Sequence, residues 1–250
     1  MTDTIERRPL VIAHGGASAG APEHTIVAFE TAIAEGADAI GLQVRLTRDA
    51  HPVVFGPDAL ERTTNGRGSL SEHTVRDLKR LDAGRGKDPR FGGQRIQTLH
   101  EVLERFRDRT RFWIELPHDE DAEGAIEERV VSIIEIYDAV ELCQVQSAHG
   151  AALRRVRALN PEIKLGISWS GGGTLDRLLQ AAPALEVVSA ALVIGAAGVE
   201  AIRSAGLGCY VGKADEPALV DRLVGWRVDG IFTGRPGMVR TRIDRSDRFA

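Results

Sequence analysis

Two side chains in the sequence combine a chemically active type with a position at the end of an expected β-strand. His14 follows the apolar run LVIA, and Glu115 follows the apolar run FWI. An imidazole exchanges protons near neutral pH, and a carboxylate binds a hard cation or accepts hydrogen bonds. If the two strands lie in one sheet, this pair predicts a site for acid–base or cation chemistry, at which we expect a small-molecule ligand.

The stretch IGLQVRLTRDAHPVVFGPD, residues 40–58, predicts a strand, a tight turn and a second strand. Apolar residues at positions 40, 42, 44 and 46 alternate with Gly41, Gln43 and Arg45, so that one face of the first strand is apolar. The other face begins with a glycine and a neutral amide. We expect this face to lie near His14 and Glu115, where it contributes no negative charge.

Short apolar runs followed by amphipathic segments recur along the chain, which is typical of βα units and a parallel sheet. They predict an α/β fold, a (β/α)8 TIM barrel, in a single domain over residues 1–250. The eight expected strands are residues 9–13, 39–45, 112–116, 142–147, 163–168, 187–194, 207–211 and 229–233.

Helices are expected between these strands. Thr25 is a suitable cap for a helix whose apolar face repeats at Ile26, Phe29 and Ile33, and Gly36 ends it. Further helices are predicted at residues 150–159, 174–181, 197–205 and 216–225. Residues 52–55 are too close to the second strand for a crossover and predict a hairpin, and residues 56–100 form a long insertion with one short helix near residues 71–81.

Composition excludes several classes of protein. A formal net charge of -4 with scattered Lys and Arg argues against a nucleic-acid partner. No run is long enough for a membrane span, and the first apolar run has only four residues, so we expect a cytoplasmic protein. Cys143 and Cys209 match no metal spacing and are expected to be buried free thiols. The sequence leaves the oligomeric state open.

Ordered motifs along nearly the whole chain resemble the glycerophosphodiester phosphodiesterase family. AHGGASAGAPEHT resembles the family's HRG and PENT motifs, and GADAIGLQV resembles GAD followed by I-E-x-D-V. The match continues through LERTTNGRG, LDAG, IQTLHEVL, WIEL and VDGIFTGRP. The resemblance implies a barrel enzyme that holds Mg²⁺ or Ca²⁺ with three carboxylates, uses two histidines as acid and base, and binds phosphate with an Arg and a Lys.

The resemblance assigns three family site residues to this chain. His14 matches the first histidine, Glu23 the PENT glutamate, and Glu115 the third metal carboxylate. Elsewhere the family residue is replaced. Gly41 and Gln43 stand at the paired carboxylates, Gly15 at the phosphate Arg, Gly56 at the second histidine, Pro117 at the phosphate Lys, His24 at the PENT Asn and Gly234 at an Asp.

These replacements predict a barrel of this family in which phosphodiester hydrolysis is lost or strongly reduced. The protein then has a binding or regulatory role, or catalyses a changed reaction. His14 and Glu23 are the remaining candidates for catalytic residues, and Glu115 is the remaining candidate for a metal ligand. We expect no cofactor, and at most weak binding of Mg²⁺ or Ca²⁺ at Glu115. The expected ligand lies at the barrel mouth and contains phosphate. The alternative is an active, metal-dependent enzyme that releases glycerol 3-phosphate and an alcohol.

Other polar segments near the strand ends admit two interpretations. The run PHDED, residues 117–121, is a substitute cation site or a solvated loop, and SWSGGGT, residues 168–174, holds an anion on backbone amides or forms a mobile loop. His24, His51, Asp58 and His149 are candidates for a displaced acid, but their spacing does not bring them together.

Overall fold

The computed structural model describes residues 8–117, 125–170 and 185–246. Within these ranges eight parallel strands form a closed barrel, because β1 pairs with both β10 and β2. The predicted TIM barrel is therefore confirmed. Its strands are β1 Leu10–His14, β2 Ala39–Leu46, β5 Arg111–Glu115, β6 Cys143–Ser147, β7 Lys164–Trp169, β8 Val187–Ala191, β9 Gly208–Gly212 and β10 Gly230–Thr233.

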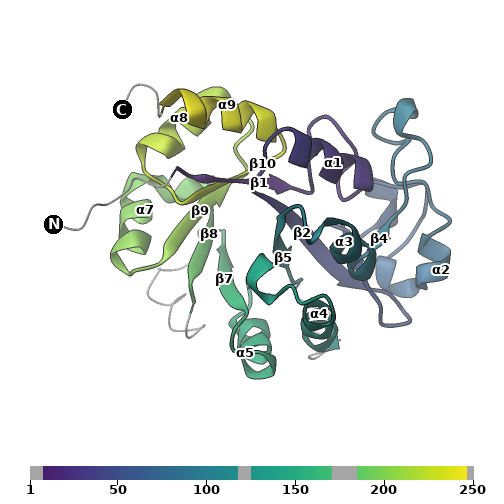
Figure 1. The fold of residues 1–250 in the computed structure, drawn as a ribbon. Helices are drawn as coiled ribbons and strands as arrows, with labels where there is room; N and C mark the ends of the chain where they lie inside the picture. Colours follow the sequence, from purple (N-terminus) through teal and green to yellow (C-terminus); the bar gives the residue numbers. More distant parts are fainter. Residues whose placement is uncertain (1–7, 118–124, 171–184, 247–250) are drawn as a thin grey trace.

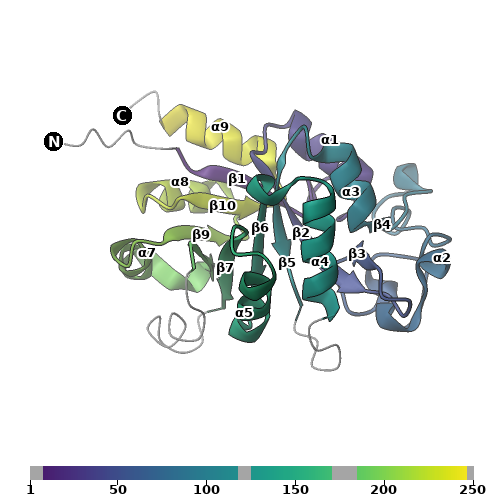
Figure 2. The same cartoon turned by 60° about the horizontal axis from the view of Figure 1, so that its bottom comes forward.

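Helices lie around the outside of the barrel, as Figures 1 and 2 show. The described ones are α1 Ile26–Ala34, α3 Leu99–Phe106, α4 Ala125–Ile136, α5 Gly150–Leu159, α7 Gly195–Ser204, α8 Pro217–Gly225 and α9 Pro236–Ser246. In α1 the Thr25 side chain accepts a hydrogen bond from the amide of Ala28, as its N-cap position predicts. Phe29 of this helix is fully buried against the barrel.

Two expected elements differ from the structure by three residues or more at one or both ends, and a third is not described. The predicted strand at residues 187–194 is wrong beyond Ala191, where pairing with β9 ends and a 3₁₀ turn, Leu192–Ile194, begins. The predicted helix at residues 71–81 is reduced to α2, Val75–Leu78, preceded by a 3₁₀ turn, Leu70–Glu72, because Thr74 caps α2 in a capping box with Asp77. The predicted helix at residues 174–181 lies outside the described residues.

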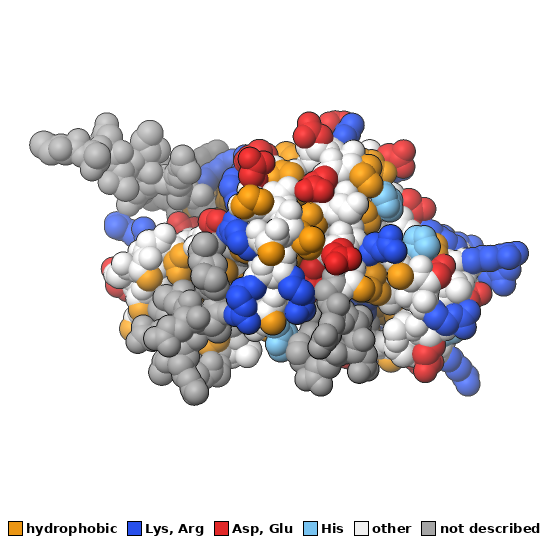
Figure 3. Space-filling model, turned by 90° about the horizontal axis from the view of Figure 1, so that it is seen from below, with side chains coloured by type: hydrophobic (Ala, Val, Ile, Leu, Met, Phe, Trp, Pro, Cys, Tyr) orange, Lys and Arg blue, Asp and Glu red, His pale blue; other side chains and the backbone are white. Residues whose placement is uncertain are grey.

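The insertion forms a side structure next to β2. β3, Pro52–Val54, pairs antiparallel with β2 and confirms the hairpin, and β4, Gln97–Thr98, pairs with β3 in turn. The insertion has its own apolar cluster, and 3₁₀ turns at Leu60–Arg62 and Pro89–Phe91 complete it. Many of its Lys and Arg side chains are exposed and gather at the right of Figure 3.

Apolar packing occurs on both sides of the strands. A large cluster of Val, Ile and Leu lies between the strands and the helices, and a smaller one fills the barrel interior. The inner cluster contains Ile12, Trp113 and Phe232, and the Trp113 ring lies 5.1 Å from that of Tyr210. Because alternate strand residues point the same way, His14 and Glu115 continue the inward faces of Ile12 and Trp113 toward the carboxyl ends of β1 and β5.

Two predictions about side chains and membranes can also be compared with the structure. Cys143 and Cys209 are both free and buried, as predicted. Among the helices in the described part of the chain, none combines the length and apolar character that a bilayer crossing requires.

Candidate functional site

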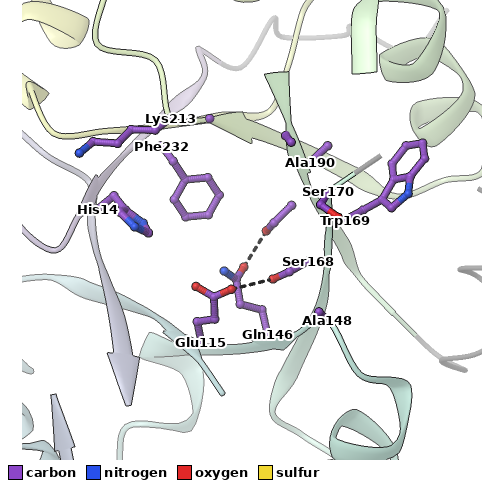
Figure 4. A pocket seen from close by; sticks show the side chains of 13 residues that line it. His14, Glu115, Gln146, Ala148, Ser168, Trp169, Ser170, Ala190, Lys213 and Phe232 are labelled. Carbon is purple, nitrogen blue, oxygen red and sulfur yellow. Dashed lines mark hydrogen bonds between the residues drawn. The ribbon is translucent and has the colours of Figure 1, made fainter. Parts of the chain in front are cut away.

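A pocket of about 390 Å³ opens at the carboxyl ends of the barrel strands. Figure 4 shows its side chains, with polar groups from β5, β6 and β7 facing His14 and Phe232 of β1 and β10. The lining residues are His14, Glu115, Gln146, Ala148, Ser168, Trp169, Ser170, Ser189, Ala190, Ala191, Gly212, Lys213 and Phe232. The pocket thus combines hydroxyl, amide, carboxyl and ammonium groups with an apolar wall.

Strand register brings Gln43, Glu115 and Gln146 side by side on β2, β5 and β6. The Nε2 of Gln43 donates to Oε2 of Glu115 at 3.3 Å, and the hydroxyl of Ser168 donates to Oε1 at 3.3 Å. Gln146 instead accepts a hydrogen bond of 2.6 Å from Ser189. Both carboxyl oxygens of Glu115 therefore have protein donors.

Burial raises the pKa of Glu115, and the bonds from Ser168 and Gln43 and the charge of Arg45 oppose the shift. Arg45 donates two hydrogen bonds to the carbonyl oxygen of Gly56 and forms an ion pair with Asp58. The net direction of the shift shows that the protein environment disfavours negative charge on Glu115.

His14 lies on the pocket wall with its ring edge-on to that of Phe232, at a centroid distance of 6.3 Å. Burial, followed by the charges of His24 and Lys213, lowers the pKa of His14 to about 4, while Glu23 and Asp215 act in the opposite direction. The imidazole is therefore neutral at pH 7 and available as a proton acceptor or a hydrogen-bonding group.

His24 is buried beside Gln43, next to the pocket wall. A β-carbon added at Gly56 would lie 2.5 Å from Oε1 of Gln43 and 3.0 Å from Nε2 of His24, and one added at Gly15 would lie 3.5 Å from the same Nε2. Burial lowers the pKa of His24 to about 4, although its hydrogen bond with Gln43 opposes the shift. The ring thus occupies space next to both glycines, and its Nδ1 has no hydrogen-bond partner among the described residues.

Gln43 connects His24 to Glu115. Its Oε1 faces the His24 ring and its Nε2 donates to Glu115, so that the neutral His24 is protonated on Nε2. The chain of contacts from His24 through Gln43 and Glu115 to Ser168 joins the loop after β1 to β2, β5 and β7. It fixes the orientation of the only carboxyl group on the pocket wall that the structure describes.

Lys213 follows β9 and brings a positive charge to the pocket. Its Nζ donates to Oγ of Ser18 at 3.3 Å and lies 3.6 Å from Oδ2 of Asp215. The other oxygen of Asp215 accepts hydrogen bonds from the Thr233 hydroxyl at 2.9 Å and the Gly234 amide at 2.7 Å. Asp215 therefore fixes the end of β10 and orients Lys213 at the same time.

Comparisons with known proteins agree with this architecture. The family model described as "Glycerophosphoryl diester phosphodiesterase family" matches residues 14–238. The chain belongs to this family. It is 34% identical over 233 residues to a glycerophosphodiester phosphodiesterase of Caldanaerobacter subterraneus subsp. tengcongensis, which covers 92% of this chain and 95% of that protein.

Two further relatives of the family are similar over most of their length. A glycerophosphodiester phosphodiesterase of Bacillus subtilis is 31% identical, over 92% of this chain and 85% of that protein. The solved structure of an Oleispira antarctica phosphodiesterase in complex with its product sn-glycerol-3-phosphate superposes with a TM-score of 0.89. That protein is 28% identical, over 95% of this chain and 97% of that one.

The structure places the three residues that the family resemblance assigns in different surroundings. His14 and Glu115 line one pocket, whereas Glu23 lies near Gly15, whose added β-carbon would be 3.2 Å from that of Glu23. Glu23 does not line the pocket, although its charge acts on His14. A catalytic role for His14 and Glu23 and a metal role for Glu115 stay predictions.

Of the four candidates for a displaced acid, His24 contacts this network directly and His149 lies beside it. His24 contacts Gln43, whereas His51 is exposed beside Asp49 at 3.6 Å. Asp58 pairs with Arg45, and His149 borders a separate, smaller pocket with Gln43 and Glu115. Of the two polar segments considered as a cation site and an anion site, 117–121 and 168–174, the parts at residues 118–121 and 171–174 lie outside the described residues.

The sequence analysis did not predict two features of the pocket region, the position of Lys213 on its wall and the contact of His24 with Gln43. Lys213 was missed because β9 was predicted to end at position 211, but it ends at Gly212, directly before the lysine. A strand one residue longer would have placed Lys213 at the barrel mouth. The contact of His24 depends on the path of the loop after β1, for which the sequence has no periodic signal.

The described residues at the mouth do not fit the divalent cation that the family resemblance implies. Hard cations need several oxygen ligands, preferably anionic ones. Glu115 is a single carboxyl with a raised pKa and protein donors on both oxygens, and its neighbours at the family's other two ligand positions are Gly41 and Gln43. Within the part of the chain that the structure describes, no three His, Cys, Asp or Glu residues form a group that could hold a metal ion.

Proposed function

We propose that this member of the family binds a small molecule at the barrel mouth and has lost, or strongly reduced, metal-dependent hydrolysis of glycerophosphodiesters. The observation that carries the proposal is the hydrogen bond from Gln43 to Glu115. At position 43 the family resemblance implies a carboxylate that shares a cation with Glu115. Here an amide donor takes the place of the cation on Oε2.

The loss of several groups argues for a large effect on the reaction rate. A general acid contributes about 100- to 10,000-fold, and the electrostatic stabilisation of a developing charge is usually the larger contribution. The second histidine is replaced by Gly56, and the phosphate Arg and Lys are replaced by Gly15 and Pro117. Because these groups act on one phosphate, their losses combine.

The pocket supports a ligand with both hydroxyl and apolar surfaces. Ser168, Ser189 and Gln146 provide donors and acceptors on one side, and Phe232 provides an apolar surface on the other. A volume of about 390 Å³ is within the range of small-molecule sites. Since sn-glycerol-3-phosphate is the product bound by the Oleispira relative, it is the first ligand to test.

Hydrolysis assays on the purified chain test the loss of activity. We expect turnover of glycerophosphocholine to be at least about 100-fold below that of an active family member with either Mg²⁺ or Ca²⁺. We also expect EDTA to leave any residual rate unchanged. A family-typical rate that EDTA and Glu115→Gln both abolish would show the alternative, an active metal-dependent enzyme, to be correct.

A restored variant gives a sharper test of the same proposal. The family residues implied at positions 15, 41, 43, 56 and 117 are Arg, Glu, Asp, His and Lys, but a β-carbon at Gly56 would lie 3.0 Å from Nε2 of His24. Restoration therefore has to include His24→Asn, which is also the residue that the PENT motif implies. We expect turnover only in this six-site variant, and equal turnover in the unchanged chain would overturn the proposal.

A further inference from the structure

A positive charge reaches the barrel mouth from a direction that the family motifs do not predict. The two phosphate-binding cations implied by the resemblance are replaced by Gly15 and Pro117. Lys213 is nevertheless on the pocket wall and is the one Lys or Arg among the described lining residues. Figure 4 shows its side chain running past Phe232 toward the side of the pocket on which His14 lies.

The space that Lys213 occupies depends on a second replacement. A β-carbon added at Gly234 would lie 2.9 Å from Cε and 3.0 Å from Nζ of Lys213. The resemblance implies an Asp at position 234. A negative side chain is therefore absent from the place where an ammonium group now lies, and the local potential becomes more positive.

A second ammonium group lies close to the first. Nζ of Lys87, from the insertion, donates to the carbonyl oxygen of Ser18 at 3.0 Å, and Nζ of Lys213 donates to the hydroxyl of the same serine at 3.3 Å. The facing carboxylate is Asp215, at 3.6 Å from Nζ of Lys213, and its second oxygen already accepts two hydrogen bonds from β10 and the residue after it. Glu23 and Glu115 are the other carboxyl groups near His14 and the pocket.

We propose that Lys213, supported by Lys87, binds the phosphate of a small organic phosphate directly, in place of a metal-bridged contact. The inference rests on the proposed function, because it takes the barrel mouth as a ligand site that needs no divalent cation. An ammonium–phosphate hydrogen bond is charge-assisted and stronger than a neutral one. On binding, Nζ of Lys213 exchanges its contact with Ser18 for a phosphate oxygen, and Asp215 continues to orient the side chain.

Calorimetry with sn-glycerol 3-phosphate in EDTA tests this inference, with glycerol as the uncharged comparison. We expect the phosphate to bind and Lys213→Gln to weaken binding by about 10- to 100-fold, as for the loss of a hydrogen bond to a charged group. Lys213→Arg should retain most of the affinity, and Lys87→Gln should weaken it less than Lys213→Gln. Affinity should also fall when the salt concentration is raised from about 50 to about 500 mM, because dissolved ions screen the attraction between ammonium and phosphate groups. The Debye length is already only about 10 Å at 0.1 M salt.

Lys164→Gln is the matched control, because Lys164 begins β7 at the opposite end of the barrel and pairs with the exposed Glu141. Thermal melts of all variants check that the fold is retained. Equal affinity of Lys213→Gln and the unchanged chain in EDTA would overturn the inference and leave the metal-free ligand site standing. Binding only with added Ca²⁺ or Mg²⁺ would overturn both, and no binding under any condition would overturn the role of Lys213.

Discussion

The side-chain amide of Gln43 and the carboxyl of Glu115 face each other across paired strands, and the amide donates to Oε2 at 3.3 Å. A backbone pairing thus places a neutral donor directly opposite a carboxyl group. This position is sensitive to charge, because neighbouring strands are separated by only about 4.8 Å.

Gln43→Asp should lower stability at neutral pH. Two carboxylates on paired positions repel each other, and each disfavours ionisation of the other. We expect the melting temperature to fall by several degrees at pH 7.5 and by less at pH 5, as about 1 kcal/mol shifts it by roughly 2–4 °C in a chain of this size. Gln43→Asn removes the same contact without adding charge, and an equal fall in both variants would exclude repulsion as the cause.

Gly56→His should be much less destabilising when His24 is changed to Asn. The added β-carbon lies within 2.5 Å of Gln43 and 3.0 Å of His24 in the present structure, and a smaller residue at position 24 frees part of that space. We expect a coupling free energy of about 1–2 kcal/mol in a double-mutant cycle measured by urea unfolding. Gly86→His is the control, since no atom lies within 4 Å of its added β-carbon, and additive effects at positions 24 and 56 would contradict the contact.

The buried imidazole of His24 should make stability fall as pH decreases from about 6.5 to about 4. Burial lowers its pKa from 6.5 to about 4, so that the unfolded chain binds more protons than the folded chain in this interval. For one histidine the loss approaches about 3 kcal/mol at pH 4. The contribution of Glu115 to the pH dependence of stability has the opposite sign. Because the pKa of Glu115 is raised in the folded chain, its contribution is most favourable below the unfolded pKa of 4.5 and is lost as pH rises.

Comparison of unfolding curves for the unchanged chain and His24→Gln isolates the histidine contribution. His14 has the same lowered pKa, so the variant should lose about half of the slope that the two buried histidines produce between pH 4 and 6.5, whereas His51→Gln, at an exposed position, should keep all of it. Identical slopes in all three proteins would mean that His24 is already accessible to protons in the folded state.

Ser168→Ala should raise the pKa of Glu115 further. The hydroxyl donates to Oε1 and stabilises the ionised carboxyl, so its removal favours the protonated form. Carbon-detected NMR titration of labelled Glu measures the change. Ser189→Ala is the control, because that hydroxyl donates to Gln146 and not to the carboxyl. A pKa that moves equally in both variants would contradict a specific contact from Ser168.

The sequence predicted the parts of the fold that depend on periodic burial. Alternating and helical patterns located all eight strands and the helices at residues 150–159, 197–205 and 216–225, because buried faces repeat at fixed intervals. The end of β8 and the length of α2 were predicted incorrectly, since both depend on local capping and turns. The pairing of β4 with β3 joins residues over 40 positions apart, and it has no signal in a two-residue strand.

The site was predictable only where a residue ends a strand. His14 and Glu115 could be placed together from strand position alone, and the pocket contains both. His24 could not, because it lies in a loop, where its φ of +59° and its contact with Gln43 depend on the fold around it. Lys213 likewise contacts Ser18, 195 positions away in the sequence.

The position of the His24 ring has a consequence for how this lineage can change. A β-carbon at position 56 would lie 3.0 Å from Nε2 of His24 and 2.5 Å from Oε1 of Gln43, so a histidine there requires both side chains to move. A sequence with histidine at position 56 should therefore also differ from this one at position 24 or 43. Packing thus couples the residue types at positions 24, 43 and 56, and these three positions should vary together among related sequences.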